Sequence, residues 1–490
     1  MKKLNPLISN LMIKRFFSSL LGLLTAFAGW SQSPQLPDDP RQLTIYQVMV
    51  ASFIHGEGGA EGYTRMWGPD GHTKNGNLRG IIQSLDHIQA LGCNAIWMTP
   101  IFDSSLTKSE EKLKATGYFT NNYFAVDPHF GTEAELRELI DEAHRRGIAV
   151  IFDGVFGHHG GITSPSPAGL LPDGEGAHSD RHNGGGANIA FPASLPYITE
   201  VATYWIDQFG IDGWRLDVAP QLLQGGHNYW VEVRRSVERL CAERRQRGET
   251  VGILGYMVGE DWGDANVVNN GVYTQGGLVS AFDFEGKERI SGPMQSADGE
   301  GLTDLFGDIV TTLSEPTVRG YLSDEVMPNL FLSNHDGYRL ADHFSDSDPY
   351  LYDKLMLRHA ILAMYSGPIT LYYGDEFGDL SRNTVGAQKD NIARTSGHIH
   401  ARDAQEQRLC DYVSHVMHLR ANHTAMWRGI TSSQVLTTER GQVLVVTKTD
   451  PFSSDVVDMV VSDHYDNVLL PGSDQPVFVT PYRALIIPRN

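Results

Sequence analysis

The chain of 490 residues contains few cysteines, few positive charges and no apolar run long enough to span a membrane. The three cysteines, Cys93, Cys241 and Cys410, are odd in number and have no metal-type spacing. They argue against a disulfide framework and favour buried free thiols. The 39 Lys and Arg residues are outnumbered by 59 Asp and Glu residues, giving a formal net charge of −20. So acidic a chain is not expected to bind nucleic acid or an anionic membrane.

An apolar run from residue 16 to residue 28 follows four basic residues near the N-terminus. The run is short for a membrane span, which needs about 20 residues. It ends in Ala26-Phe27-Ala28, a small-residue pattern typical of a cleavage site. We therefore expect residues 1–28 to be a signal peptide and the protein to be exported, either to the periplasm or out of the cell. An uncleaved anchor is the alternative, but after cleavage no membrane association is expected.

Strand-like and helical patterns alternate along residues 40–425. Runs rich in β-branched and aromatic residues predict strands at 44–53, 93–101, 148–156, 210–218, 251–259, 277–284, 328–334 and 367–373. Amphipathic stretches predict helices at 79–91, 133–146, 196–209, 228–245, 351–365 and 404–421. Eight such repeats favour an α/β fold, a parallel (β/α)8 TIM barrel. A doubly wound open sheet is the main alternative, but no Gly-rich dinucleotide fingerprint follows the first strand.

Two segments interrupt this alternation. Residues 157–195 are rich in Gly, Pro, Ser and His without a period, which predicts a short loop-rich insertion after the third strand. A plain surface loop is the alternative. From 426 to 490, short alternating runs separated by turn residues predict a small all-β domain. We therefore expect a barrel over 40–425, including the insertion at 157–195, and a C-terminal β-sandwich over 426–490.

Four apolar runs end in charged or imidazole side chains. Charged groups rarely lie beside a core unless they are paired or functional. In a β/α barrel, the residues that end the strands converge at one rim. We therefore expect one pocket to contain the carboxylates that end these runs, which are Asp153, Asp217, Glu260 and Asp336.

Crowded carboxylates repel one another, so that one can be ionised while another is protonated. Glycoside hydrolysis needs this combination, an ionised nucleophile and a proton donor on either side of the scissile bond. Arg215 lies two residues before Asp217 and projects to the same side of the strand, so it would keep Asp217 ionised. Trp262, two residues after Glu260, is an apolar neighbour that would suit Glu260 to donate a proton.

Metal-dependent hydrolysis is the competing chemistry, because His158, His159, His335 and Asp336 could ligate zinc. Barrel metallohydrolases usually carry a His-x-His at the end of the first strand. Here the first strand ends in Val50-Ala51-Ser52-Phe53. We therefore assign no catalytic metal. Core ion pairs are the other alternative.

The order and spacing of these motifs resemble the conserved regions of the α-amylase family, glycoside hydrolase family 13. The similarity extends from Tyr46-Gln47 to Tyr372-Tyr373-Gly374-Asp375-Glu376. It implies that Asp217 is the covalent nucleophile, Glu260 the acid/base and Asp336 the residue that stabilises the transition state. It also implies a retaining reaction, with the first two carboxyl groups about 5–5.5 Å apart. The remaining sugar-site residues that it implies are Tyr118, Asp153, His158, Arg215, Trp262 and His335.

Within the family, Gly213–Ala219 resembles the neopullulanases and cyclomaltodextrinases, which accept α-1,4 and some α-1,6 links. Four departures from the family pattern stand out. Gly157 replaces an Asn that many α-amylases use to bind calcium, and Pro220-Gln221 replaces a Lys-His pair. Phe119 stands where the family often has Asp, and the loop before the fourth strand carries no clear copy of the usual motif.

The resemblance implies an exported retaining glycosidase that cleaves α-glucosidic bonds of starch-derived glucans or maltooligosaccharides. No cofactor is expected for the chemistry, a structural calcium ion stays open, and the oligomeric state is not predicted. One alternative is a transglycosylase that hands the intermediate to a sugar acceptor. Another is a non-catalytic binding relative, which the three retained catalytic carboxylates disfavour.

Overall fold

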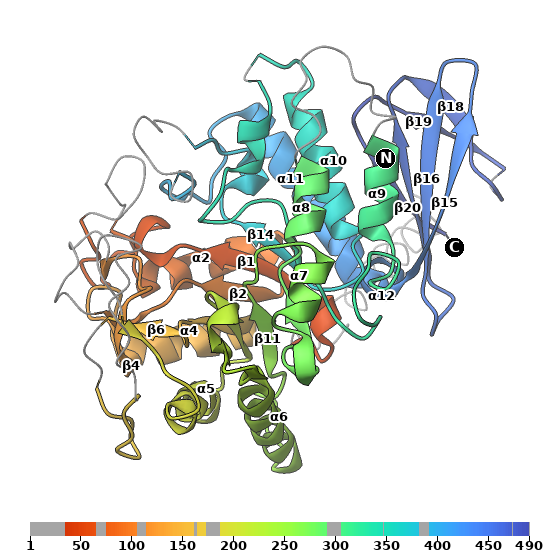
Figure 1. The fold of residues 1–490 in the computed structure, drawn as a ribbon. Coiled ribbons are helices and arrows are strands. Elements are labelled where there is room, and N and C mark those ends of the chain that lie inside the picture. The colour runs from red at the N-terminus through yellow and green to blue at the C-terminus, as the bar shows by residue number, and fades with distance from the viewer. Residues whose placement is uncertain are drawn as a thin grey trace, which may run out of the picture. The chain divides into compact units, whose positions relative to one another are not determined.

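A computed structural model describes residues 35–64, 75–104, 114–160, 164–172, 187–291, 305–345, 347–381, 392–472 and 474–489 (Figure 1). The predicted signal peptide and much of the predicted insertion lie outside these ranges. The described residues from Leu36 onward form one compact unit. None of the helices in the described part of the chain is both long and apolar enough to cross a bilayer.

Eight parallel strands make one curled sheet (Figure 1). They are β1 (Thr44–Val48), β2 (Ala95–Met98), β5 (Ala149–Gly154), β8 (Gly213–Leu216), β11 (Tyr256–Gly259), β12 (Ser280–Ala281), β13 (Leu330–Phe331) and β14 (Ile369–Tyr372). Neighbours pair in the order β12-β11-β8-β5-β2-β1-β14-β13. A parallel bridge between Phe282 and Asn329 joins the chain after β12 to the chain before β13. The bridge closes the circle, so the predicted (β/α)8 barrel is confirmed.

The six predicted helices are present, and in each of them the helical pattern of apolar residues extends over many residues. They are α2 (Leu78–Ala90), α4 (Glu133–Arg145), α5 (Leu195–Phe209), α6 (Trp230–Gln246), α10 (Leu351–Ala363) and α11 (Ala404–Asn422). Helix α4 shows why the ends were predictable. The Thr132 hydroxyl accepts the Glu135 N–H, and the Glu135 carboxylate accepts the Thr132 N–H, as in a capping box.

The shorter elements were not predicted. They comprise the helices α7 (Ala265–Asn270), α8 (Phe284–Ser291), α9 (Phe306–Leu313) and α12 (Thr424–Arg428), the strand pair β3 (Phe102–Ser104) and β4 (Thr120–Val126), and the two-residue strands β9 (Leu223–Gln224) and β10 (His227–Asn228). Short 3₁₀ turns lie at η1 (Pro40–Gln42), η2 (Val50–Ser52), η4 (Ala219–Leu222), η5 (Thr274–Gly276), η7 (Leu340–His343) and η8 (Asp375–Phe377). Most of these elements are shorter than the span over which a helical or strand period can be counted, and the seven residues of β4 do not alternate between apolar and polar.

The described part of the predicted insertion begins with an antiparallel pair, β6 (His158–His159) and β7 (Ala187–Asn188). The carbonyl of Gly157 accepts the N–H of Ile189 at 2.9 Å, which continues the pairing. The insertion therefore leaves and rejoins the barrel beside the end of β5.

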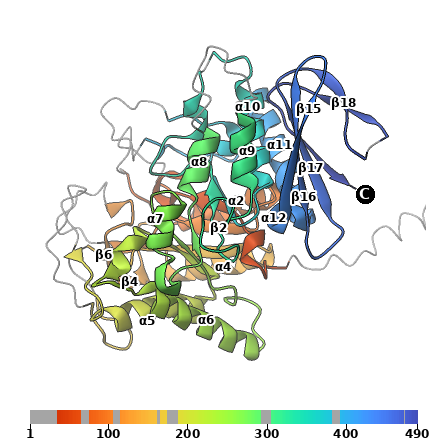
Figure 2. The same ribbon diagram turned by 45° about the vertical axis from the view of Figure 1, so that its right-hand side comes forward.

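The C-terminal segment forms two antiparallel sheets. One contains β15 (Ile430–Thr437), β16 (Gln442–Thr449), β17 (Val456–Ser462) and β20 (Leu485–Arg489), and the other contains β18 (Asp466–Leu469) and β19 (Pro476–Val479). Buried valines and leucines from both sheets make a small separate core. Helices α9 and α12 contact the larger sheet, and both views show them beside it (Figures 1 and 2). The predicted all-β C-terminal architecture is confirmed.

Candidate active site

The barrel brings the predicted residues together at the carboxyl ends of its strands. Asp153 lies near the end of β5, Arg215 lies in β8 and Asp217 follows β8, while Glu260 directly follows β11. Backbone hydrogen bonds continue beyond the strands: the Asp217 N–H donates to the Gly154 carbonyl at 3.0 Å, and the Glu260 N–H to the Leu216 carbonyl at 2.9 Å. Residues distant in sequence are therefore held in register on neighbouring strands.

Arg215 is the centre of this group. Its guanidinium is almost fully buried, and Nη1 donates to Asp153 Oδ1 at 2.8 Å and to Asp217 Oδ1 at 3.0 Å. Its Nη2 lies 3.0 Å from Glu260 Oε1. The other Glu260 oxygen accepts the N–H of Val218 at 2.9 Å. One guanidinium thus fixes three carboxylates from three strands and keeps Asp217 and Glu260 side by side.

The electrostatics of the group differ in part from the prediction. Burial raises the pKa of Asp217 well above its usual value, and the neighbouring Glu260, Asp153 and Asp336 raise it further. Arg215 lowers the pKa, as the sequence predicted, but its effect does not outweigh that of burial. Burial likewise raises the pKa of Asp153 to about 6, against the opposing effect of Arg215. Asp217 and Asp153 therefore hold protons more tightly than isolated carboxylates do.

A second group surrounds His335. Its Nε2 lies 2.7 Å from the Tyr118 hydroxyl and 3.1 Å from Asp336 Oδ2, and the Tyr118 ring stacks on the imidazole at 5.3 Å. The Tyr118 hydroxyl also donates to Asp153 Oδ2 at 2.9 Å, which connects this group to the Arg215 group. Burial lowers the pKa of His335 well below its usual value, with Arg394 and Arg215 adding to the effect. His335 is therefore neutral at neutral pH.

His158 and Trp262 complete the predicted set. His158 Nε2 lies 3.9 Å from Asp217 Oδ2. Trp262 behaves differently from the expectation, because it contacts Glu260 through its indole N–H, which donates to Oε1 at 3.0 Å. Its ring stacks on Phe284, and the residue is 57% exposed to solvent. Trp262 is therefore a hydrogen-bond donor at the rim rather than an apolar wall.

Three further residues at the site were not predicted from the sequence. Gln47 Nε2 lies 2.7 Å from His335 Nδ1, and the indole N–H of Trp97 donates to Asp153 Oδ2 at 3.1 Å. Arg394 donates to Asp336 Oδ1 at 2.6 Å. An amide inside the apolar first strand was a usable signal for Gln47. Arg394 carried none, because it lies outside every strand-like run.

The structure gives a direct test of whether position 157 suits calcium. Gly157 offers no side-chain ligand, and a Cβ atom there would lie 2.1 Å from Gln221 Oε1 and 2.3 Å from Gln221 Cβ. The residues present therefore do not fit the family's calcium-binding asparagine. Among the described residues, no group of three or more His, Cys, Asp or Glu side chains could hold a metal ion.

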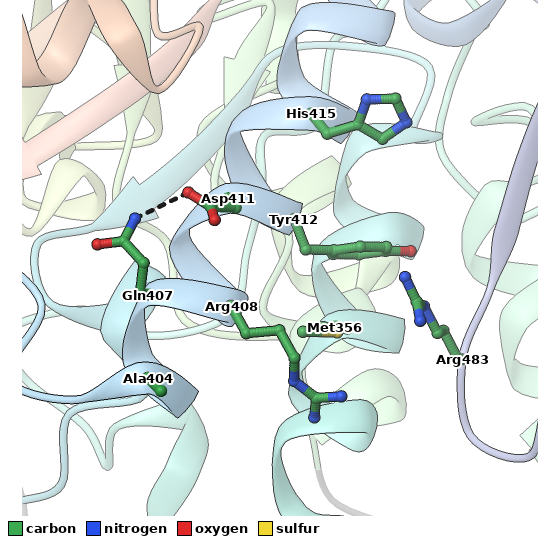
Figure 3. A pocket seen from close by; sticks show the side chains of 8 residues that line it. All are labelled: Met356, Ala404, Gln407, Arg408, Asp411, Tyr412, His415 and Arg483. Carbon is green, nitrogen blue, oxygen red and sulfur yellow. Dashed lines mark hydrogen bonds between the residues drawn. The ribbon is translucent and has the colours of Figure 1, made fainter.

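A cavity of about 460 Å³ lies elsewhere, on the outer side of the barrel beside the C-terminal sheets (Figure 3). In Figure 3, Tyr412 of α11 and Arg483 approach one another across it. None of the nine predicted site residues lines this cavity. The converging carboxylates, rather than this cavity, define the candidate active site.

The arrangement matches the requirements of acid-assisted displacement at a sugar carbon. Two of the three predicted catalytic carboxylates share one guanidinium, the third is held by Arg394, and stacked rings flank them. The fold and the site therefore define a barrel protein of the glycoside hydrolase type. A family model described as "Alpha amylase, catalytic domain" matches residues 47–164 and 188–426, and the chain belongs to the alpha-amylase family.

Individual relatives agree with this assignment. The chain is 30% identical to a cyclomaltodextrinase of Bacillus sp. over 70% of its own length and 60% of the relative's. It is 28% identical to neopullulanase 2 of Thermoactinomyces vulgaris over 80% of its length and 65% of the relative's. The chain thus spans less than two thirds of these curated relatives. Among solved structures, the chain is similar to AmyP in complex with maltose, with 34% sequence identity and a TM-score of 0.76. The match covers 91% of this chain and 96% of the AmyP chain.

Proposed function

We propose that the protein is a retaining glycoside hydrolase that cleaves α-glucosidic bonds, α-1,4 and in some substrates α-1,6, in starch-derived glucans or maltooligosaccharides. Asp217 attacks the anomeric carbon, Glu260 protonates the leaving oxygen and later activates water, and Asp336 stabilises the charge of the transition state. The names of the relatives, cyclomaltodextrinase and neopullulanase, support this substrate class.

One observation carries the proposal: Arg215 holds Asp217 Oδ1 and Glu260 Oε1 with two nitrogens of the same guanidinium, at 3.0 Å each. Two carboxyl groups that share a guanidinium are close enough to act on one glycosidic bond, as a retaining mechanism requires. Tyr118, Asp153, His158, Trp262 and His335 would then line the sugar site around them.

Export is also a proposal. It rests on the basic and apolar pattern of residues 1–28, which is typical of a signal peptide. N-terminal sequencing of the protein recovered from the periplasm or medium of a producing bacterium would test it.

The catalytic proposal is tested by Asp217→Asn and Glu260→Gln on two kinds of substrate. Asp217→Asn should lower kcat on maltooligosaccharides by at least about 10⁴-fold, because no glycosyl-enzyme can form. Glu260→Gln should slow natural oligosaccharides far more than aryl glycosides with good leaving groups, because only the former need a proton. Proton NMR of the first product should show the α-anomer.

Asp261→Asn is a matched control, because Asp261 adjoins Glu260 but its carboxylate accepts the backbone N–H of Val272. It should retain most of the activity. Wild-type turnover by Asp217→Asn would contradict the assignment, and so would equal losses on both substrate kinds for Glu260→Gln. Product analysis at high sugar concentration separates hydrolysis from transfer to a sugar acceptor.

A further inference from the structure

Gln221 lies where the family pattern would need room for the side chain of an asparagine. We propose that Gln221 is a positioning residue for His158, and that it replaces the calcium-binding asparagine of other family members with a direct hydrogen bond from protein to imidazole. The inference rests on the proposed function, because His158 is taken to contact the bound sugar.

The first argument is steric. A Cβ at Gly157 would lie 2.1 Å from Gln221 Oε1 and 2.3 Å from Gln221 Cβ, far inside contact distance. The Oε1 could rotate away, but the Cβ is fixed to the backbone of η4. The backbone of Gly157 is not in the left-handed region that favours glycine, since it has no positive φ. Gly157 is therefore required by the Gln221 side chain and not by the conformation of the backbone. The two positions exclude each other: a side chain at 157 and glutamine at 221 cannot occupy the same space.

The second argument is the contact that Gln221 makes. Its Oε1 lies 3.0 Å from His158 Nδ1, and His158 Nε2 lies 3.0 Å from the Tyr118 carbonyl. A carbonyl only accepts, so Nε2 carries a proton. An amide can accept from a protonated Nδ1 or, after rotation, donate to a bare one. Gln221 can therefore hold the imidazole ring, 3.9 Å from Asp217, in either protonation state.

The third argument is that the backbone under Gln221 is itself fixed. Gln221 belongs to η4, and its N–H donates to the Val218 carbonyl at 2.9 Å. Its carbonyl accepts from Gln224 Nε2, which also donates to the Ile189 carbonyl, both at 2.9 Å. This network ties η4, which directly follows the proposed nucleophile, to the base of the insertion. No metal ion is needed to connect these two segments.

The steric argument is tested by a double-mutant cycle on the full chain, with thermal unfolding as the readout. Gly157→Asn alone should lower Tm by several degrees, because the new side chain collides with Gln221. Gly157→Asn combined with Gln221→Gly should recover most of the loss, because both the Oε1 and the Cβ that a side chain at 157 would meet are then removed. If Gly157→Asn leaves Tm unchanged, or if the double variant is no more stable than the single one, mutual exclusion is wrong. This cycle needs no activity, so it stands even if the proposed function fails.

The positioning role is tested on kcat and KM for a maltooligosaccharide. Gln221→Met should lower kcat/KM about tenfold, since the imidazole loses its hydrogen bond. Gln221→Glu keeps an acceptor for a protonated Nδ1 but cannot donate to a bare one, so it should recover more of the loss at low pH than at high pH. Gln224→Met is the matched control, because Gln224 braces the same segment without contacting His158; it should lower Tm and leave KM unchanged. Equal kcat/KM losses for Gln221→Glu and Gln221→Met, or for Gln224→Met and Gln221→Met, would overturn the role.

The calcium part is tested by calorimetric titration of chelator-treated wild-type protein with Ca²⁺, and by Tm with EGTA and with added calcium. We expect no calcium-dependent change in Tm. A rise in Tm with calcium that Gln221→Ala abolishes would place a calcium site at this position and overturn the inference. A rise that Gln221→Ala and Gly157→Asn both leave intact would place calcium elsewhere and leave the assignment of Gln221 in force.

Discussion

Arg215 supplies one positive charge that three carboxylates of the site share. Its two terminal nitrogens contact Asp153 of β5, Asp217 just after β8 and Glu260 just after β11. The centres of the Trp97 and Tyr118 rings lie 5.1 and 5.6 Å from its guanidinium carbon. Removal of this cation would leave several buried carboxylates without compensation. Burial and the neighbouring carboxylates raise the pKa of Asp217 and Arg215 lowers it, so the charge on the proposed nucleophile depends on this guanidinium.

Sequence reasoning was most effective for residues that end a strand. Asp153, Asp217 and Glu260 were recognisable because a charged group followed an apolar run, and the barrel brings them together. Arg394 was missed because it lies outside every strand-like run and its partner Asp336 is 58 residues away. Gln47 carried a local signal, an amide in an apolar strand, but its contact with His335, 288 residues away, could not be read from it. No local pattern encodes such a contact.

Asp375 offers a pH test outside the catalytic group. Burial raises the pKa of its carboxyl to about 7, although Arg339 Nη1 lies 3.6 Å from Asp375 Oδ1. An acid with a raised pKa in the folded state stabilises the protein below its unfolded pKa of about 3.9, and this contribution is lost as pH rises through about 7. Asp375→Asn should therefore gain about 2–3 kcal/mol in stability relative to wild type between pH 5 and pH 8.

Urea unfolding of both proteins at the two pH values measures this difference. Glu133→Gln, at an exposed position of α4, is the control and should show no comparable change. A constant difference between Asp375→Asn and wild type across the range would contradict the prediction.

At the scale of elements, the barrel is closed between two short strands by a few backbone contacts around Asn329. Asn329 precedes β13, bridges to Phe282 through its backbone, and is fully buried. Its side chain donates to the Tyr256 hydroxyl at 3.0 Å and accepts from the Thr370 hydroxyl at 2.9 Å. It thus connects β11 and β14 across the gap at which the first and last strands of the sheet meet.

Asn329→Leu should destabilise the protein by about 2–4 kcal/mol, because two hydrogen bonds are lost and polar partners stay buried. The measurement is the midpoint of urea unfolding with its slope. Thr370→Val, which removes only one of the two bonds, should cost about half as much. A loss below about 1 kcal/mol for Asn329→Leu would show that this connection does not hold the barrel closed.

The elements themselves were predictable in proportion to their length. Helix α4, with its capping box and four buried apolar residues, needed no tertiary information. The strands β12 and β13 have only two residues each, and the predicted runs around them were several residues too long. Short strands depend on neighbours in the barrel for their pairing, so a local pattern defines them poorly.

At the scale of the whole molecule, the junction between the barrel and the C-terminal sheet contains a buried amine. Lys448 of β16 donates from Nζ to the Leu313 carbonyl of α9 at 3.0 Å and to the Thr431 hydroxyl at 2.9 Å. Burial lowers the pKa of Lys448 to about 7. The unfolded chain binds this proton up to about pH 10.4, so the wild-type protein gains stability as pH rises from about 7 toward 10.

The free energy of unfolding of Lys448→Met relative to wild type should therefore be most favourable at pH 6. It should fall by about 3 kcal/mol between pH 6 and pH 9.5. The sign is opposite to that expected for Asp375→Asn. Urea unfolding at both pH values measures it, with Lys287→Met as control, since that amine pairs with Glu288. If the difference between Lys448→Met and wild type does not change with pH, the amine is not buried as the structure has it.

Local sequence accounts for much of this protein: the eight repeats, the long helices, the β-rich C-terminal segment and the acids that end the strands. Each of these depends on neighbours within a few turns or one strand, which a pattern records. Which side chains meet is a different matter. The contact of Gln221 with Gly157 and His158, the link from Arg394 to Asp336 and the direction of the Trp262 indole exist only after the barrel has closed. They join residues through space, and burial then changes their chemistry.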